Sequence, residues 1–202
     1  MSGGEDAERH KFKMEKKKAA RDKIMAAKTD QRGLVIVHTG KGKGKSTAAW
    51  GMAMRTLGHG WRVGIVQFVK GKWDTGERGV FEKFGDQCVI EAHGEGFSWE
   101  SQDLERDKAA AARAWDAACK MMADETISLV IMDEINIALR YGQLDSEMVV
   151  EALKNKREDQ HVVLTGRNAL DEIIDAADLV TEMTQIKHPF RSGIKAQAGI
   201  EF

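Results

Sequence analysis

The sequence predicts an α/β fold in which a mostly parallel central sheet of about six strands carries helices on both faces. Short segments rich in Val and Ile alternate with helical patterns, which is typical of parallel strands covered on both sides. A segment of alternating glycine and lysine, residues 39–47, stands between the first such strand and a helical pattern, as a phosphate-binding loop does. Together these observations predict a RecA-like P-loop fold.

The individual elements follow from the same apolar segments. The strands are predicted at residues 33–38, 62–69, 87–92, 127–132, 161–165 and 179–185. The longest helix is predicted at about residues 103–123. Apolar residues recur there at helical spacing and are predicted to face the core: Leu104, Ala111, Trp115, Ala118, Cys119 and Met122.

The composition fits one soluble globular domain preceded by a basic arm. Of the 202 residues 42% are hydrophobic and 31% charged, and no apolar stretch is long enough to cross a membrane. Residues 9–23 hold eight Lys or Arg against two acidic residues. We therefore predict a basic, helical or partly disordered arm at 1–32 and a P-loop domain at 33–202. A charged N-terminus unlike a secretory signal, and Cys88 and Cys119 as reduced thiols in apolar contexts, make a cytoplasmic location the expectation.

Residues 39–47, Thr-Gly-Lys-Gly-Lys-Gly-Lys-Ser-Thr, are predicted to bind ATP. Glycines let such a loop curl so that its backbone N–H groups face inward, and the following helix adds the positive end of its dipole. Lys45 can then lie along the β- and γ-phosphates, while the Ser46 hydroxyl can ligate Mg²⁺. Thr39 stands where the usual pattern has its first glycine. The candidate ATP-binding residues in the loop are Thr39, Gly40, Lys41, Gly42, Lys43, Gly44, Lys45, Ser46 and Thr47.

A second nucleotide signal lies at residues 127–134, where an apolar strand pattern ends in Asp133 and Glu134. Ligands bind at the carboxyl ends of the strands in open α/β sheets. Both carboxylates are therefore candidate Mg²⁺ ligands, and in a hydrolase Glu134 could activate water. The alternative is a pair of acidic residues that only caps the next helix.

Three other segments have both a functional and a structural interpretation. Phe97 and Trp99 lie in a loop among glycines and polar residues, where aromatic side chains serve either ligand binding or core packing. Arg167 follows a predicted strand and is expected at the same sheet edge as Lys45, unless it forms a surface salt bridge. Residues 188–202 are predicted to form an ordered C-terminal wrap. No pair of histidines has the spacing of a zinc site.

Taken in order, these segments resemble the P-loop ATP:corrinoid adenosyltransferases, the cob(I)yrinic acid a,c-diamide and cob(I)alamin adenosyltransferase family. The resemblance covers about residues 33–202 and includes the shifted glycine register of the loop. Lys41 stands where some members carry Asn, and Ser46 where Thr is frequent. The other matching blocks are Arg55-x-x-Gly58-His59-Gly60, Val66-Gln67-Phe68-x-Lys70-Gly71, Gly76-Glu77-Arg78, Gly96-Phe97-x-Trp99-Glu100, Asp133-Glu134, Thr165-Gly166-Arg167, and the tail from Lys187-His188 through Lys195-Ala196-Gln197-x-Gly199-Ile200.

The resemblance implies that cobalt(I) of a reduced corrinoid attacks C5′ of ATP and displaces triphosphate, in adenosylcobalamin biosynthesis or salvage. It implies Lys45 and Glu134 as catalytic residues, and Mg²⁺ or Mn²⁺ held by Ser46, Glu134 and Asp133. It also implies that ATP lies in the loop in the reverse of the usual sense. Both the a,c-diamide of biosynthesis and a salvaged cobinamide fit as substrates.

Further roles follow from the same resemblance. Phe97 and Trp99 would form an apolar wall at the lower face of the corrin, and Arg167 would contact the corrinoid or the nucleotide phosphates. Arg55 would contact ATP. A homodimer is implied, and the electron would come from a separate reductase, because the chain shows no flavin or iron–sulfur signature. The N-terminal arm would order over the substrate-loaded site.

Two other function classes remain possible on the residues alone. The first is an ordinary P-loop ATPase or kinase, linked to nucleic acid through residues 9–23. That segment lacks interleaved aromatics and a recognition motif, so nucleic-acid binding is not expected. The second is a nucleotide-gated binding module without turnover.

Overall fold

The computed structural model describes residues 3–69, 76–94 and 103–201, and the chain forms two units, Met1–Arg32 and Gly33–Phe202. The first unit contains one helix, α1 (Gly3–Ala26), rich in the strong helix formers Ala, Lys, Glu and Arg. The side chains of residues 6–26 are exposed in this helix. Within the described part of the chain, no helix combines the length and apolar character needed to span a membrane.

The second unit is built on a six-stranded sheet in which every pair of neighbouring strands is parallel. The strand order is β3-β2-β4-β5-β1-β6. The strands are β1 (Val35–Thr39), β2 (Arg62–Gln67), β3 (Cys88–Ala92), β4 (Ile127–Asp133), β5 (His161–Thr165) and β6 (Leu179–Glu182). The predicted fold class and all six predicted strands are therefore confirmed.

Two strands end earlier than predicted. Strand β2 ends at Gln67, although the next two residues, Phe68 and Val69, are also apolar and buried in the core. The end of the apolar segment therefore does not coincide with the end of the strand. After β6, the backbone of Met183 is hydrogen-bonded to Thr39, and the chain then leaves the sheet.

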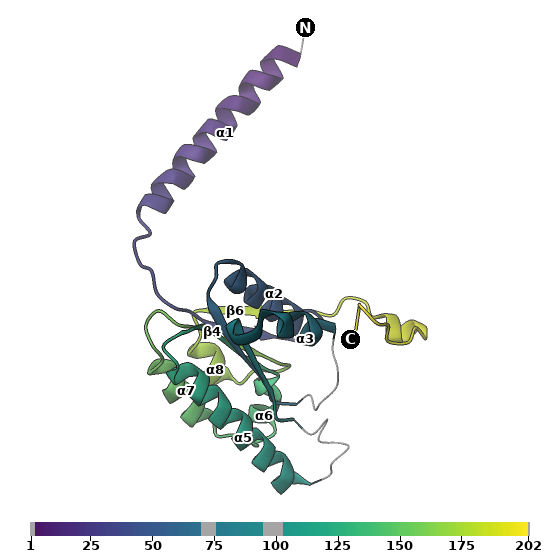
Figure 1. Ribbon diagram of the computed structural model, residues 1–202. Helices are drawn as coiled ribbons and strands as arrows, with labels where there is room; N and C mark the ends of the chain where they lie inside the picture. The colour runs from purple at the N-terminus through teal and green to yellow at the C-terminus, as the bar shows by residue number, and fades with distance from the viewer. Residues whose placement is uncertain (1–2, 70–75, 95–102, 202) are drawn as a thin grey trace. The chain divides into compact units, whose positions relative to one another are not determined.

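Helices cover both faces of the sheet, as predicted (Figure 1). One face carries α2 (Lys45–Gly58) and α3 (Gly76–Phe81), followed by the short 3₁₀ helix η1 (Glu82–Gln87). The other carries α5 (Leu104–Ala123), α6 (Ile135–Arg140), α7 (Ser146–Lys154) and α8 (Asp171–Asp175). Each face has its own core because side chains alternate along a strand. In β1, Ile36 joins the α2 core, whereas Val35 and Val37 join the α5 core.

Helix α5 begins one residue after the predicted start, and Asp103 caps it by accepting a hydrogen bond from the backbone N–H of Arg106. Ala111, Trp115 and Ala118 are buried, while Cys119 and Met122 pack partly buried against the same core. The prediction for Leu104 is wrong, since this side chain is 54% exposed. The first buried residue of α5 is Ala110, so the N-terminal turns of the helix lie outside the packed region.

Both cysteines are free thiols, as predicted. Burial raises the pKa of Cys88 to about 11, and burial also raises the pKa of Cys119. Both side chains are therefore protonated and weakly nucleophilic at neutral pH.

We predict that deleting residues 1–28 leaves a folded domain that binds ATP. The first strand begins at Val35, and among the described residues the two cores and the side chains packed against them begin with Leu34, so the deletion removes no core residue. The thermal midpoint, followed by circular dichroism, should stay within a few degrees of the full chain. Deleting residues 1–37 is the control and should abolish cooperative unfolding, because it removes most of β1. An unfolded 29–202 chain would contradict the division into arm and domain.

Candidate functional site

The predicted phosphate loop connects β1 to α2 and is held against the chain that follows β6. Gly42 donates its backbone N–H to the carbonyl of Met183 at 2.6 Å, and Met183 donates its own N–H to the carbonyl of Thr39 at 2.9 Å. A Cβ on Gly42 would lie 2.7 Å from the carbonyl oxygen of Met183. The close approach of two backbones therefore requires glycine at this position. Gly44, at φ 103°, is left-handed and directly precedes α2.

Lys45 lies inside the curl of the loop, with 6% of the residue exposed. Its Nζ donates hydrogen bonds to the carbonyl oxygens of Gly40 at 3.0 Å and Gly42 at 2.5 Å. Burial lowers the pKa of Lys45; the charge of Glu134 opposes this and that of Arg167 adds to it. The loop carbonyls thus hold a partly desolvated ammonium group that an anionic ligand would stabilise further.

The acidic side of the site lies at the end of β4. Asp133 is fully buried, and its carboxylate accepts a hydrogen bond from the Thr165 hydroxyl at 2.7 Å and lies 3.5 Å from the amide nitrogen of Gln67. The same hydroxyl accepts the backbone N–H of Glu134 at 2.9 Å. Glu134 adopts a left-handed conformation, φ 67°, which is uncommon for a residue other than glycine. It stands at the N-cap of α6 without a capping side-chain bond, so the helix-capping alternative finds no support.

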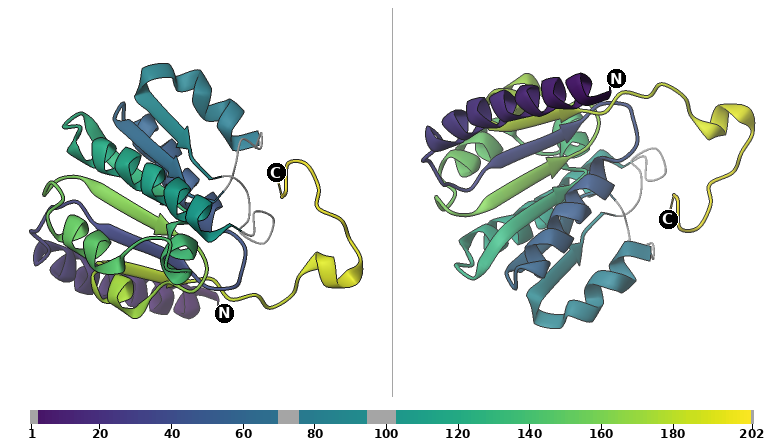
Figure 2. Two further views of the ribbon diagram at one scale, coloured as in Figure 1. Left: turned by 90° about the horizontal axis from the view of Figure 1, so that it is seen from below. Right: turned by 90° about the horizontal axis from the view of Figure 1, so that it is seen from above.

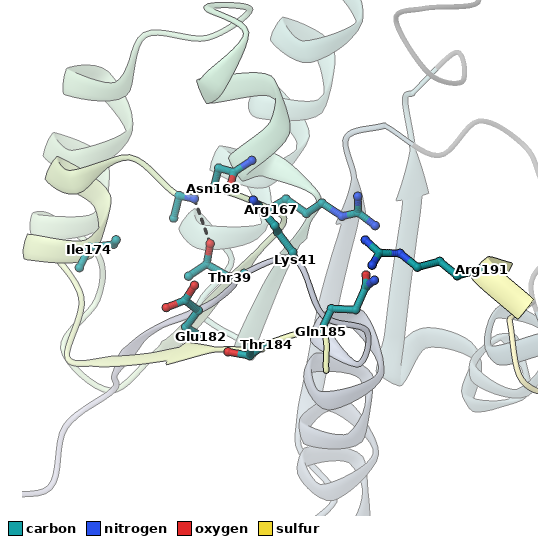
Figure 3. Close-up of a pocket in the computed structure, with 11 residues that line it drawn as sticks. Thr39, Lys41, Arg167, Asn168, Ile174, Glu182, Thr184, Gln185 and Arg191 are labelled. Atoms are coloured by element: carbon teal, nitrogen blue, oxygen red, sulfur yellow. Dashed lines mark hydrogen bonds between the residues drawn. The ribbon is translucent and has the colours of Figure 1, made fainter. Parts of the chain in front are cut away.

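A cavity of about 630 Å³ opens beside the first residues of the loop (Figure 3). Thr39 forms part of its wall, and the Thr39 hydroxyl accepts the backbone N–H of Ala169 at 3.0 Å. Lys41, Arg167 and Arg191 bring three cationic side chains to the cavity. Arg167 is thus at the same sheet edge as Lys45, as predicted. It has no ion pair with any residue that the structure describes, so the salt-bridge alternative is not supported.

The remaining candidates are not all brought together. Ser46 and Thr47 lie in the first turn of α2, next to Lys45. Arg55 is exposed in the last turn of the same helix, roughly 15 Å farther along the axis at 1.5 Å per residue. The structure therefore does not place Arg55 at the loop of its own chain. Phe97 and Trp99 lie outside the described residues.

The structure adds two residues to which the sequence assigned no role. The buried His38 of β1 has its Nδ1 3.2 Å from the carbonyl oxygen of Lys45, which can only accept, so the contact requires a proton on Nδ1. Burial lowers the pKa of His38, with this backbone contact opposing. Gln67 ends β2 and pairs in register with Asp133. In the sequence, Asp133 was recognised as a candidate because it is a polar residue at the end of an apolar strand. Gln67 could have been recognised by the same pattern.

The C-terminal tail also reaches this region. Lys43 of the loop forms an ion pair with Glu201. The tail contains the short 3₁₀ helix η2 (Pro189–Ser192) and otherwise has irregular structure, and residues 189–200 are exposed. It extends away from the sheet before it returns toward the loop (Figure 2), so the predicted wrap is a loosely packed segment.

Comparison with known proteins identifies the family. A family model described as "ATP:corrinoid adenosyltransferase BtuR/CobO/CobP" matches residues 31–202. The chain belongs to this family. A second model, described as "Cob(I)alamin adenosyltransferase N terminal", matches residues 1–25.

Relatives match nearly the whole chain. The corrinoid adenosyltransferase of Sinorhizobium sp is 59% identical over 199 residues, which cover 98% of this chain and 93% of that protein. The corrinoid adenosyltransferase of Pseudomonas aeruginosa strain PAO1 is 48% identical over 198 residues, which cover 98% of each chain. The one from Escherichia coli K12 is 42% identical over 195 residues, which cover 96% of this chain and 98% of that protein.

Replacing Gly42 by Ala is expected to weaken ATP binding. The added methyl group would overlap the Met183 carbonyl and displace the loop backbone, and such overpacking costs roughly 1–3 kcal/mol, so we expect a Kd about tenfold higher. Calorimetric titration with ATP measures this. Gly51→Ala is the matched control, since a Cβ there meets nothing within 4 Å, and its affinity should be unchanged. Equal affinities for both variants would show that the contact with Met183 does not shape the loop.

Proposed function

We propose that this protein transfers the 5′-deoxyadenosyl group of ATP to the cobalt(I) of a reduced corrinoid and releases triphosphate. The observation that carries the proposal is membership of the corrinoid adenosyltransferase family along residues 31–202. The glycine loop with its buried Lys45 and the carboxylates at the end of β4 support ATP as the co-substrate. Family membership favours this reaction over an ordinary P-loop ATPase or kinase.

In the proposed reaction an electron pair on cobalt attacks C5′ of the ribose. A Co–C bond forms as the C5′–O5′ bond breaks, and the electron pair of that bond leaves on the α-phosphate oxygen of triphosphate. The protein's task is to stabilise this growing negative charge with groups already in place. The backbone N–H groups of the loop, the N-terminus of α2 and Lys45 are suited to it, since Lys45 can exchange two loop carbonyls for phosphate oxygens.

We further propose that Ser46, Asp133 and Glu134 hold Mg²⁺, or Mn²⁺ in its place. These side chains supply oxygen donors alone, which suits a hard cation. The described residues contain no cluster of three or more His, Cys, Asp or Glu, so phosphate oxygens and water would complete the coordination, as is usual for Mg²⁺ at nucleotide sites. The ion would add positive charge next to the leaving triphosphate.

The partners proposed for this reaction follow from the family. We propose a homodimer in the cytoplasm that receives its electron from a separate reductase. Phe97 and Trp99 are proposed to wall the lower face of the corrin and to keep water and other axial ligands away from cobalt. The basic arm, residues 1–32, is proposed to order over the loaded site.

Product analysis tests the proposed function, with Lys45→Ala as the key variant. The wild-type protein, given ATP, Mg²⁺ and chemically reduced cobalamin, should form the visible spectrum of adenosylcobalamin and release triphosphate. Lys45→Ala should keep its fold and lose about 10²–10³ in rate, the usual cost of removing one such charge-stabilising donor. ADP and phosphate as the products would identify an ATPase instead, and near-normal turnover of the variant would assign the role to another lysine.

The proposed corrin wall predicts a dependence on the oxidation state of cobalt. Replacing Phe97 and Trp99 together by Ala should spare ATP binding and cripple activity with a cobalt(II) substrate and a biological reductant. Activity with pre-reduced cobalt(I) should fall less, because the axial ligand is then already gone.

Core packing of the two aromatics predicts a different outcome. Each replacement would then cost roughly 3–5 kcal/mol of folding free energy and depress both assays together. Thermal unfolding of the double variant separates the two outcomes. A stable variant with normal activity from cobalt(II) would contradict both roles.

A further inference from the structure

We infer that Arg191 of the C-terminal tail binds the terminal phosphate of ATP and makes the site select a triphosphate over a shorter chain. Nothing in the family resemblance assigns a role to this residue. The inference deepens the proposed function and rests on it in one respect, namely that the triphosphate of ATP occupies the loop at residues 39–47.

A short turn of the tail presents Arg191 to the site. The 3₁₀ helix η2 begins with Pro189, whose fixed φ favours a helical start, and the His188 ring accepts the backbone N–H of Phe190 at 3.2 Å. Arg191 follows in this turn. Its side chain points back toward the phosphate loop and into the cavity beside it (Figure 3).

The charges around this cavity are unbalanced. The guanidinium groups of Arg167 and Arg191 face each other, and Lys41 lies on the same cavity (Figure 3). None of the three forms an ion pair with a residue in the described ranges 3–69, 76–94 and 103–201. Glu182 is the acidic residue among those that line the cavity, and its carboxylate points away from both guanidinium groups. Facing cations repel each other, so a bound polyanion would be favoured between them.

The residues that line the cavity also indicate which end of ATP would enter it. The apolar ones, Ala169 and Ile174, are aliphatic, and the described lining offers no aromatic ring to stack on adenine. Guanidinium groups instead match phosphate oxygens, which they bind through paired hydrogen bonds. The cavity borders Thr39 and Lys41, at the start of the loop, between the segments that follow β5 and β6 on either side of β1. A third phosphate that extends past the loop in this direction would meet Arg191, whereas a chain of two phosphates would end before it.

A second contact ties the tail to the same loop. Glu201 forms its ion pair with Lys43, ten residues beyond Arg191. An exposed pair of this kind stabilises the fold little. It does, however, bring the far end of the tail to the phosphate loop, so the tail meets the site at two separate points.

Calorimetric titration without corrinoid tests the inference on the full chain. The ligands are inorganic triphosphate, pyrophosphate, ATP and ADP, and the variants are Arg191→Ala and Arg191→Lys. Arg191→Ala should raise the Kd for triphosphate and ATP roughly tenfold or more, since the variant loses a charge-assisted hydrogen bond to the terminal phosphate. The Kd for pyrophosphate and ADP should not change. Arg191→Lys should recover part of the affinity, because lysine restores the positive charge but not the paired N–H donors of the guanidinium group.

Lys120→Ala is the control, because it removes one exposed positive charge from the last turn of α5, at the sheet edge opposite the phosphate loop. It should leave all four affinities unchanged. The inference is overturned if Arg191→Ala behaves like this control, or if it weakens all four ligands equally. Circular dichroism verifies the fold, and Arg191→Gln replaces the Ala variant if that variant unfolds.

The outcome is separable from that of the proposed function. A wild-type chain that prefers triphosphate through Arg191 but forms no adenosylcorrinoid would support the inference and refute the transferase. Adenosylation by the wild type, with triphosphate binding untouched in Arg191→Ala, would do the reverse.

Discussion

The Thr165 hydroxyl is the contact on which the acidic half of the site depends. It donates to the buried carboxylate of Asp133 and accepts the backbone N–H of Glu134, which fixes two consecutive residues at the end of β4. Strand β5, which ends in Thr165, lies between β4 and β1, and Thr165 pairs in register with His38. Because the carboxyl ends of parallel strands share one edge, this hydroxyl couples the carboxylates to the strand that carries the phosphate loop. The backbone of Glu134 is left-handed and therefore strained, and the hydrogen bond from its N–H to the Thr165 hydroxyl helps to hold it in this conformation.

The basic half of the site depends on how the charge of the buried Lys45 is stabilised. Lys45 is buried, and its desolvation is offset by two loop carbonyls and by the charge of Glu134. Arg167 acts against it, since like charges at short range disfavour the ammonium form. A triphosphate in the loop would attract both Lys45 and Arg167 and so offset the repulsion between them, without any movement of the strands. The polar groups are therefore preorganised for a polyanion, which is the condition for strong electrostatic stabilisation.

The sequence predicted what depends on local patterns and missed what depends on distant contacts. The six strands and the loop were predictable because apolar segments and a glycine-rich turn are short-range signals. Met183 and Arg191 could not be found in this way, since they reach the loop from segments about 140 residues farther along the chain. Arg55 stays a prediction from the motif match, since the structure places it in the last turn of α2 and shows the position of this residue within a single chain. The division at residue 32 and the roles of Phe97 and Trp99 stay predictions.

The positions of the charged groups bear on which bond of ATP reacts. Hydrolysis of the terminal phosphate needs a base that positions water at that phosphate. Glu134, the residue suited to this role, directly follows β4, and neither it nor Asp133 is among the described residues that line the cation-rich cavity. A terminal phosphate bound in that cavity by Arg191 and Arg167 would thus be held by cations without a carboxylate placed to activate water beside it. The opposite end of the nucleotide would then lie outside the cavity, where its C5′ is available to an external nucleophile. With this polarity the same loop holds a triphosphate as a leaving group and offers its terminal phosphate little hydrolytic chemistry.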